Sequence, residues 1–330
     1  MRPRAASALS YALAVALVGV SSSCSRVSYD VVSGPRDWSA HPGFIELPAG
    51  PVVYAISDIH GGYERMVALL AGSHLVTLEL NDPKAVRWTG GDATLLVVGD
   101  LIDKGPRSLA VIDGLITLEA SAAEAGGKVI TTLGNHEGFF FVDPFSHRAD
   151  SRYGSFDREL AAAGLTPLNI ASGLDPRGKW LRERPFGVRV GNWFYSHAGE
   201  TRGRNLPQLE AMVREAVDQH DYDDDRLLGT DGLLESKEWY LDHPGRGAAY
   251  AAAVGAKHMV FGHDPTDTLS DAGQIGVAQA GAVMRIDCGM SPRVDYSHGR
   301  ILRVTRTATQ EIADSVDELG RSIELWRGPL

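Results

Sequence analysis

The amino-acid sequence predicts a layered α/β fold, and two patterns along the chain support this class. Short apolar runs rich in β-branched residues alternate with longer stretches rich in Ala and Leu, as strands and helices alternate in α/β proteins. Two later apolar runs follow one another with no helical stretch between them, which predicts a mixed sheet or a second sheet. With 330 residues, 44% of them hydrophobic, the chain is long enough to bury a large core.

The predicted elements follow from this alternation. Five buried strands read VVYAIS at 52–57, TLLVVG at 94–99, KVITTL at 128–133, VRVGNWFYS at 188–196 and KHMVF at 257–261. Helices are predicted at 63–70, 108–125, 206–220 and 247–254. The two later strands are predicted at 282–288 and 300–305.

One segment breaks the alternation. Residues 138–185 are rich in Gly, Pro, Arg and aromatic side chains. We interpret this segment as a cap-like insertion beside the active face of a single domain that spans residues 51–330.

Charge and cysteine content exclude two classes of protein. The chain has 32 Lys and Arg against 42 Asp and Glu, a net charge of -10, and its basic residues are scattered. A tightly held nucleic acid is therefore not expected as a partner. Cys24 and Cys288 could form at most one disulfide, so packing rather than cross-linking must hold the core together.

The N-terminus has the order of an export signal. Arg2 and Arg4 precede an uncharged stretch at 5–20, followed by three serines and Cys24. This stretch is short for a membrane-spanning helix, which needs about 20 residues. Residues 1–23 resemble a bacterial lipoprotein signal with Cys24 as the lipidated residue, although Ser21 stands where Leu is usual, so a plain secretory cleavage or an uncleaved anchor stays open.

This interpretation implies an exported protein of the periplasm or cell envelope, attached to the membrane through a lipid on Cys24. Residues 24–50 are polar, contain Pro35, Pro42 and Pro48, and have no clear period. They are predicted to form a flexible tether.

Polar side chains follow each of the first five predicted strands. The motifs are Asp58-Ile59-His60, Gly99-Asp100-Leu101-Ile102-Asp103, Gly134-Asn135-His136-Glu137, His197-Ala198-Gly199 and Gly262-His263-Asp264. Ligands of open α/β sheets gather at the carboxyl ends of strands. Carboxylate, imidazole and amide groups together suit Mn, Fe or Zn rather than calcium.

This series of motifs resembles that of the calcineurin-like metallophosphoesterase superfamily, and within it the phosphoprotein phosphatases and bacterial Shewanella-like phosphatases. The resemblance covers about residues 51–264 in order. It implies a sandwich of two mixed β-sheets flanked by helices. It also implies a hydrolase of phosphoric esters with two divalent or mixed-valence metal ions, Mn, Fe or Zn.

The resemblance assigns six metal ligands. Asp58 and His60 would bind one metal, Asn135, His197 and His263 the other, and Asp100 both. Two dications about 3.5–4 Å apart need a shared anionic ligand, and together they can clamp a hydroxide and the phosphate oxygens. A metal-bridging hydroxide would then attack phosphorus in line.

Two catalytic side chains are implied in the same way. His136 matches the general acid that protonates the leaving oxygen, and Asp103 matches the carboxylate that orients it. Lys104 replaces the usual Arg of the Asp-Arg-Gly motif, so a point charge replaces a bidentate phosphate clamp. Arg246 and Arg107 are further candidates for substrate binding, and a plain surface role for Arg246 stays open.

The last motif favours phosphomonoesters. Many phosphodiesterases of the superfamily end in Gly-His-x-His, whereas Pro265 stands here at the second His. The expected substrate is therefore a phosphorylated protein, with a serine/threonine- or tyrosine-type phosphatase activity, or a small phosphomonoester. The segment 105–109 resembles symmetrical dinucleoside polyphosphate hydrolases, which is one alternative, and a non-catalytic metal-binding surface lipoprotein is another.

Overall fold

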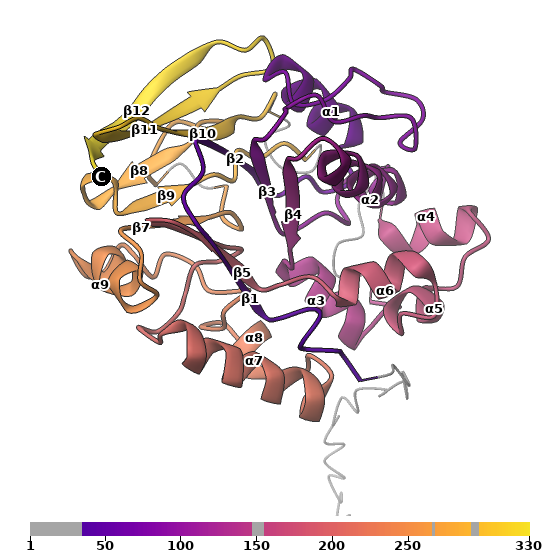
Figure 1. Cartoon of the computed structure of the whole chain (residues 1–330). Helices are drawn as coiled ribbons and strands as arrows, with labels where there is room; N and C mark the ends of the chain where they lie inside the picture. The colour runs from indigo at the N-terminus through magenta and orange to yellow at the C-terminus, as the bar shows by residue number, and fades with distance from the viewer. Residues whose placement is uncertain (1–34, 147–154, 266–267, 292–296) are drawn as a thin grey trace, which may run out of the picture.

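The structure is a computed structural model that describes residues 35–146, 155–265, 268–291 and 297–330. Two β-sheets lie face to face, and helices cover their outer sides (Figure 1). The predicted layered α/β class, with two mixed sheets, is therefore confirmed. Cys24 and the predicted signal at 1–23 lie outside the described residues.

The first sheet has the strand order β12-β11-β10-β2-β3-β4. Its strands are β2 (Val52–Ile56), β3 (Thr94–Val98), β4 (Lys128–Thr132), β10 (Ile301–Arg306), β11 (Gln310–Val316) and β12 (Ser322–Pro329). β2, β3 and β4 are parallel, whereas antiparallel pairs join β10 to β2, β11 to β10 and β12 to β11. All five residues of β3 are buried, which explains why its sequence is apolar throughout.

The second sheet has the strand order β1-β5-β6-β7-β9-β8. Its strands are β1 (Phe44–Leu47), β5 (Gly187–Val190), β6 (Trp193–Ser196), β7 (His258–Phe261), β8 (Gly276–Ala278) and β9 (Val283–Arg285). Parallel pairs join β1 to β5, β6 to β7 and β7 to β9, and antiparallel pairs join β5 to β6 and β8 to β9.

An apolar core fills the space between the sheets. Along β2, Val53 and Ala55 belong to the cluster that includes Tyr195 and Met284 of the second sheet, whereas Ile56 belongs to the cluster on the helical side. Successive side chains of a strand point to opposite faces. This two-residue period lets one short strand serve both cores.

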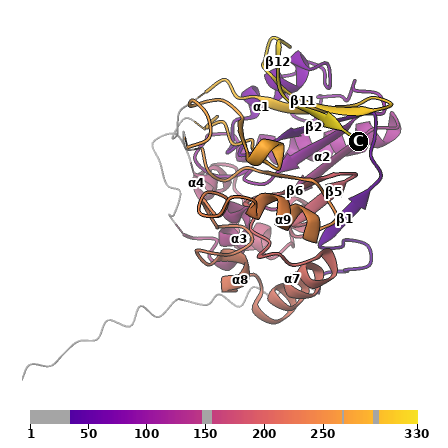
Figure 2. The same ribbon diagram turned by 90° about the vertical axis from the view of Figure 1, so that its left-hand side faces the viewer.

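Helices cover both outer faces. They are α1 (Tyr63–Gly72), α2 (Ser108–Glu124), α3 (Asn135–Val142), α4 (Phe156–Ala162), α5 (Pro167–Ala171), α6 (Pro176–Arg182), α7 (Leu206–His220), α8 (Asp225–Leu228) and α9 (Arg246–Ala253), with a short 3-10 turn at Gln279–Gly281. Figure 1 shows α1 and α2 on the first sheet, and Figure 2 shows α7 and α9 on the side of the second. The four predicted helices agree with α1, α2, α7 and α9 within two residues.

The tether prediction was wrong at its C-terminal end. β1 pairs in parallel with β5, and Phe44 is buried against Phe194. Arg36 also donates to the carbonyl oxygens of Arg182 and Arg184. The folded domain therefore begins before residue 51, because the tetrapeptide Phe-Ile-Glu-Leu, with three apolar residues within the polar stretch, completes the edge of the second sheet.

The single strand predicted at 188–196 is a hairpin. β5 and β6 pair antiparallel around Gly191, whose φ of 56° most other side chains disfavour.

The predicted insertion at 138–185 contains most of α3 and all of α4, α5 and α6. It contacts α2, because the carboxylate of Glu159 in α4 accepts from the backbone amides of Ser108 and Leu109 at the start of α2. In the described part of the chain, no helix has the length and apolar character required to cross a bilayer.

Candidate metal centre

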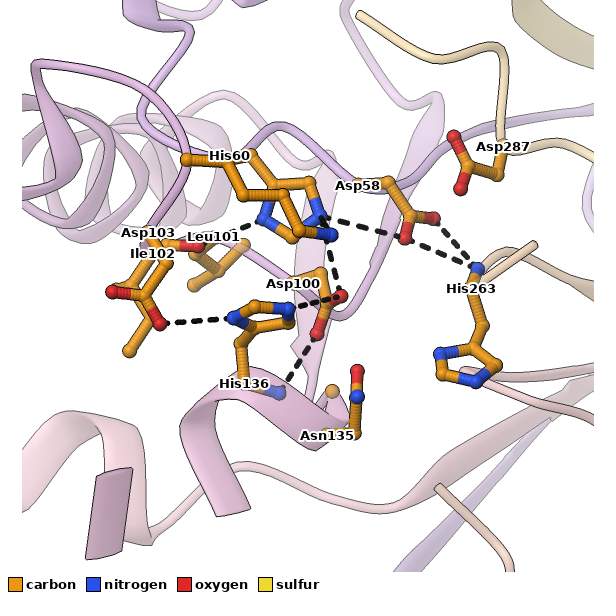
Figure 3. A network of polar contacts seen from close by, with 12 residues as sticks. Asp58, His60, Asp100, Leu101, Ile102, Asp103, Asn135, His136, His263 and Asp287 are labelled. Carbon is orange, nitrogen blue, oxygen red and sulfur yellow. Dashed lines mark hydrogen bonds and ion pairs between the residues drawn. The ribbon is translucent and has the colours of Figure 1, made fainter. Parts of the chain in front are cut away.

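Five loops that leave strand ends of both sheets bring the predicted site residues together. Figure 3 shows Asp58, His60, Asn135, His136 and His263 around Asp100. β2 leads to Asp58 and His60, β3 to Asp100, β4 to Asn135 and His136, β6 to His197, and β7 to His263. All of these side chains are buried. The structure therefore gathers the six predicted metal ligands and the predicted general acid in one place.

Backbone hydrogen bonds hold the loops side by side. The amide of Asp58 donates to the carbonyl oxygen of Gly99 (3.2 Å), and the amide of His60 donates to that of Asp100 (3.0 Å). Gly262 donates to the carbonyl oxygen of His197 (2.8 Å), which joins two loops of the second sheet. The His263 amide donates to the Asp58 carboxylate (2.9 Å), which joins the two sheets.

Several site residues have a strained backbone. Positive φ angles occur at Asp58 (53°), His60 (46°), Asp100 (54°), Asp103 (68°), Lys104 (58°) and His263 (68°). Non-glycine residues in this region cost on the order of 1–3 kcal/mol each, and they persist only where the surroundings over-determine them. This concentration of strain marks the cluster as a functional site.

Glycines in the motifs make room for the ligands. A Cβ on Gly262 would lie 2.1 Å from Oδ2 of Asp58, and one on Gly134 would lie 2.2 Å from Oδ1 of Asp100. No side chain larger than hydrogen fits at such distances. The glycines of the Gly-Asn-His and Gly-His motifs are therefore required by packing against carboxylates from distant loops.

Each imidazole of the predicted ligand set has one nitrogen committed to a backbone carbonyl. Nδ1 of His60 contacts the oxygen of Ile102 (2.8 Å), Nδ1 of His197 that of Val98 (3.1 Å), and Nε2 of His263 that of Glu235 (2.9 Å). Because a carbonyl oxygen only accepts, these nitrogens carry the protons. The other nitrogen of each ring keeps a lone pair, as a metal-binding histidine requires.

Lone pairs converge around Asp100. Nε2 of His197 lies 3.3 Å from Oδ1 of Asp100 and 3.0 Å from Oδ1 of Asn135, and neither this ring nitrogen nor the amide oxygen carries a proton. Nε2 of His60 lies 3.4 Å from Oδ2 of Asp100. Two groups of three residues have ligand atoms that all lie within 4.8 Å of one another inside the group. These groups are His60-Asp100-His136 and Asp100-His197-His263.

Burial shifts the pKa values of this cluster. Burial, followed by the neighbouring Asp287 and Asp100, raises the pKa of Asp58 well above its usual value, and burial raises the pKa of Asp100 to about 7. Burial also lowers the pKa of His197 to about 4. Neutral imidazoles beside buried carboxyls fit a divalent cation, which would supply the missing positive charge.

His136 and Asp103 form a pair beside the cluster. Nδ1 of His136 lies 2.9 Å from Oδ2 of Asp103, and the opposite nitrogen, Nε2, lies 4.0 Å from Oδ2 of Asp100. The amide of Phe156, the first residue of α4, donates to Oδ1 of Asp103 (3.2 Å). The pair is thus held from the insertion as well as from the sheet.

Glu137 is a buried residue to which the sequence analysis assigned no role. Its carboxylate accepts from the backbone amides of Gly134 (2.8 Å), Asp100 (3.0 Å), Leu101 (2.8 Å) and Ile102 (3.2 Å). Burial raises the pKa of Glu137 to about 7. This side chain joins the loop after β3 to the loop after β4.

The three predicted substrate-binding residues differ in position. Nζ of Lys104 lies 2.8 Å from Nε2 of His60, at the cluster itself. Arg107 pairs with Glu64 (2.6 Å) and donates to backbone oxygens of residues 80 and 81. Arg246, at the start of α9, donates to the carbonyl oxygen of Trp239 (2.7 Å). Lys104 is therefore the one of the three with a contact to a predicted ligand.

Two further acidic residues escaped the sequence analysis. Asp287 is buried two residues after β9, the same spacing as Asp58 after β2, but the strand predicted at 282–288 ran past it and concealed this position. Glu235 lies 2.5 Å from Asn135, 100 positions away, and no sequence pattern announces this contact.

Comparisons with known proteins agree with this geometry. The family model "Calcineurin-like phosphoesterase" matches residues 51–272. Shewanella-like protein phosphatase 1 of Plasmodium berghei is 26% identical over 274 residues, which cover 74% of this chain and 68% of the relative. The symmetrical bis(5'-nucleosyl)-tetraphosphatase of Cronobacter sakazakii is 30% identical over 165 residues, 49% of this chain and 48% of the relative.

A solved structure shares the fold. The cold-active protein-tyrosine phosphatase of a psychrophilic Shewanella superposes with a TM-score of 0.68 at 19% identity, covering 85% of this chain and 82% of that one. The predicted metallophosphoesterase-type sandwich is thereby confirmed. The chain matches only part of several curated relatives. For three of them, the matched part is between about a fifth and a half of the relative's length.

Proposed function

Because the chain belongs to the calcineurin-like phosphoesterase family, we propose that it is a two-metal phosphomonoesterase acting on a phosphorylated protein or a small phosphomonoester. One observation carries the proposal. Nε2 of His197 lies 3.3 Å from an Asp100 carboxyl oxygen and 3.0 Å from the Asn135 amide oxygen, beside the pair His136 and Asp103. A cation set next to a proton donor is what hydrolysis of an unactivated phosphoester needs.

The ligand assignment is the one that the motif resemblance implies. Asp58 and His60 would hold one ion, Asn135, His197 and His263 the other, and Asp100 both. Four of these six residues, His60, Asp100, His197 and His263, belong to the two clustered groups, and His136, the remaining member of the first group, is assigned the proton transfer instead. When bound, Mn, Fe or Zn ions supply Lewis acidity and lower the pKa of a water molecule. The mixture of carboxylate, imidazole and amide groups suits these metals.

His136 is proposed to donate a proton to the leaving oxygen. Its Nδ1 contacts the Asp103 carboxylate, which stabilises the charged imidazolium, and Nε2 on the other side of the ring faces the cluster. Without this proton the leaving group would depart as an alkoxide, which is slow. Asp103 would act through His136 by keeping the ring oriented.

Lys104 is proposed to bind the phosphate group. Its ammonium lies at the predicted ligand His60, so it is near any phosphate held by the ions. An ammonium is a compact point charge and makes no bidentate contact, so the phosphate would be attracted but less rigidly oriented than by arginine.

Hydrolysis of p-nitrophenyl phosphate by protein lacking residues 1–24 tests the proposal. Metal-depleted protein is compared with protein supplied with Mn. We expect turnover that depends on the metal. If the metal-loaded protein releases no more p-nitrophenol than the metal-depleted one, the phosphomonoesterase proposal is wrong.

A second candidate is symmetrical hydrolysis of a dinucleoside polyphosphate, because the tetraphosphatase of Cronobacter sakazakii is among the relatives. The same assay with bis-p-nitrophenyl phosphate and with a dinucleotide polyphosphate separates the activities. The first proposal expects the monoester to be the best substrate by a clear margin. A preference for the dinucleotide would favour the second candidate.

We also propose that the protein is exported and anchored through a lipid on Cys24, on the basis of the N-terminal sequence alone. Mass spectrometry of the N-terminal peptide from the native host tests this. A diacylated Cys24 is expected. An unmodified peptide that begins after residue 24, or an intact N-terminus, would contradict lipidation.

A further inference from the structure

The amide of Asn135 has two possible orientations in the candidate metal centre. Its oxygen and nitrogen are almost equal in size, and only the oxygen can bind a cation. The histidines of the same ligand set have no such ambiguity once a carbonyl group holds one ring nitrogen. A separate contact must therefore select the productive orientation of the amide.

Glu235 makes that contact. Nδ2 of Asn135 donates to Oε2 of Glu235 over 2.5 Å, and Oδ1 of Asn135 then faces Nε2 of His197 at 3.0 Å. A carboxylate only accepts hydrogen bonds. The flipped amide would place two oxygens 2.5 Å apart and would direct its NH2 group at the metal ligands, so Glu235 excludes it.

The main chain of Glu235 contacts a second member of the same set. Its carbonyl oxygen lies 2.9 Å from Nε2 of His263, which leaves Nδ1 of that ring with the lone pair. Glu235 lies in the segment between α8 and α9, away from the strand ends that deliver the ligands. One residue thus contacts two of the three ligands assigned to the second ion.

The ligands assigned to the first ion are held by other groups. The Asp58 carboxylate accepts from the His263 amide, and the His60 ring contacts the carbonyl oxygen of Ile102 and the ammonium of Lys104. A defect at Glu235 should therefore affect one ion and leave the other in place.

We propose that Glu235 is a positioning residue for the second metal ion, an inference that rests on the proposed two-metal function. Its carboxylate selects the orientation of Asn135 in which Oδ1 is a ligand. Its carbonyl oxygen selects the tautomer of His263.

Metal binding by Glu235→Ala tests the role of the carboxylate. Metal-depleted protein is titrated with Mn, and the two dissociation constants are measured by calorimetry and by metal analysis after dialysis. We expect the weaker binding to be confined to one equivalent, by about 10–100-fold, the usual effect of losing a partner of a metal ligand. Glu238→Ala is the matched control, since Glu238 is an exposed acid three residues along the same segment.

Glu235→Gln separates orientation from charge. The oxygen of a glutamine side chain can still accept from Nδ2 of Asn135, so we expect it to restore affinity to within a few-fold of the wild-type value. A loss as large as that of Glu235→Ala would mean that the negative charge, rather than the hydrogen bond, matters, and would overturn the positioning role.

A reciprocal exchange provides a second test. Asn135→Asp places a carboxylate against Glu235, and we expect it to lose the second ion. In the double variant Asn135→Asp/Glu235→Gln, the glutamine NH2 can donate to the new carboxylate, so recovery of the second ion is expected. If the double variant binds metal no better than Asn135→Asp, the contact does not position the ligand.

The outcomes for this inference and for the proposed function are distinct. If wild-type protein binds fewer than two ions, the two-metal function is wrong. If wild-type protein binds two ions and Glu235→Ala binds both with unchanged affinity, the inference is wrong and the function stands. Thermal melting of each metal-depleted variant detects misfolding, and if Glu235→Ala does not fold, the reciprocal exchange decides.

Discussion

At the scale of single residues, the site depends on residues with a strained backbone and on glycines that leave room for neighbouring carboxylates. Asp58, Asp100 and His263 have positive φ angles, and Gly134 and Gly262 lie against carboxylates from other loops. These two features have one cause. Loops from two sheets must bring ligand atoms close together, so backbone and side-chain freedom are both lost there.

His136→Asn should separate acid catalysis from metal binding. Asparagine keeps a polar side chain but cannot protonate the leaving oxygen. We expect turnover to fall by about 10²–10⁴-fold for esters with poor leaving groups, and less for p-nitrophenyl phosphate. Metal analysis should find unchanged ion content. Loss of an ion would mean that His136 is itself a ligand.

Gly262→Ala should remove the first ion. The new Cβ would overlap Oδ2 of Asp58, and we expect the carboxylate to move because the backbone bonded to this Cβ is held in the loop by hydrogen bonds. We expect at least one metal equivalent to be lost or weakened, as measured by metal analysis after dialysis. Gly50→Ala is the control, because nothing lies within 4 Å of a Cβ there. Full metal content in Gly262→Ala would show that the loop can shift without harm.

At the scale of elements, the sequence pattern predicted strands and helices best where a period or an apolar run is long. α1, α2, α7 and α9 matched closely, and α7 also carries a capping box in which Asn205 and Gln208 satisfy each other's amides. β11 and β12 were missed because neither shows an apolar run: β11 contains Gln, Glu, Asp and Ser, and most residues of β12 are exposed or half-buried.

β7 contains a histidine whose environment predicts a pH effect on stability. His258 stacks on Trp193, with ring centroids 3.9 Å apart, and its Nδ1 lies 2.8 Å from the carbonyl oxygen of Gly281. Burial lowers the pKa of His258, with Glu311 opposing and Lys257 adding to the shift. The unfolded chain, with a histidine pKa of about 6.5, therefore takes up this proton before the folded one does.

The contribution of His258 should be complete above about pH 6.5 and decline as the pH falls below it. His258→Phe keeps the aromatic packing and removes the titrating group. Urea unfolding at several pH values should therefore show a smaller loss of stability on acidification for the variant than for the wild type. Parallel pH curves for the two proteins would contradict this assignment.

At the scale of the whole molecule, residues before 51 belong to the fold. β1 forms an edge of the second sheet, Phe44 is 8% exposed, and Arg36 hydrogen-bonds to three carbonyl groups of the segment 182–184. The polar composition of this region concealed these contacts. They link the N-terminal segment to the insertion and to the second sheet.

Two shortened chains should differ in stability. A chain of residues 35–330 keeps every contact just named, whereas a chain of residues 51–330 loses β1 and exposes the surface that Phe44 covers. We expect the shorter chain to be less stable by at least about 2 kcal/mol, the value of burying one large apolar side chain. Denaturant unfolding of both chains measures the difference. Equal unfolding midpoints would mean that residues 35–50 add no stability and act only as a tether.

The sequence by itself determined the layered α/β class and the order of the ligand motifs, because each ligand directly follows an apolar strand and strand ends are local patterns. Only the tertiary structure decided how these ligands are held. Asp58 meets the amide of His263, 205 positions away, and Asn135 meets Glu235, 100 positions away. Such contacts arise from the packing of one sheet on the other and of a distant loop on both, so no local pattern contains them.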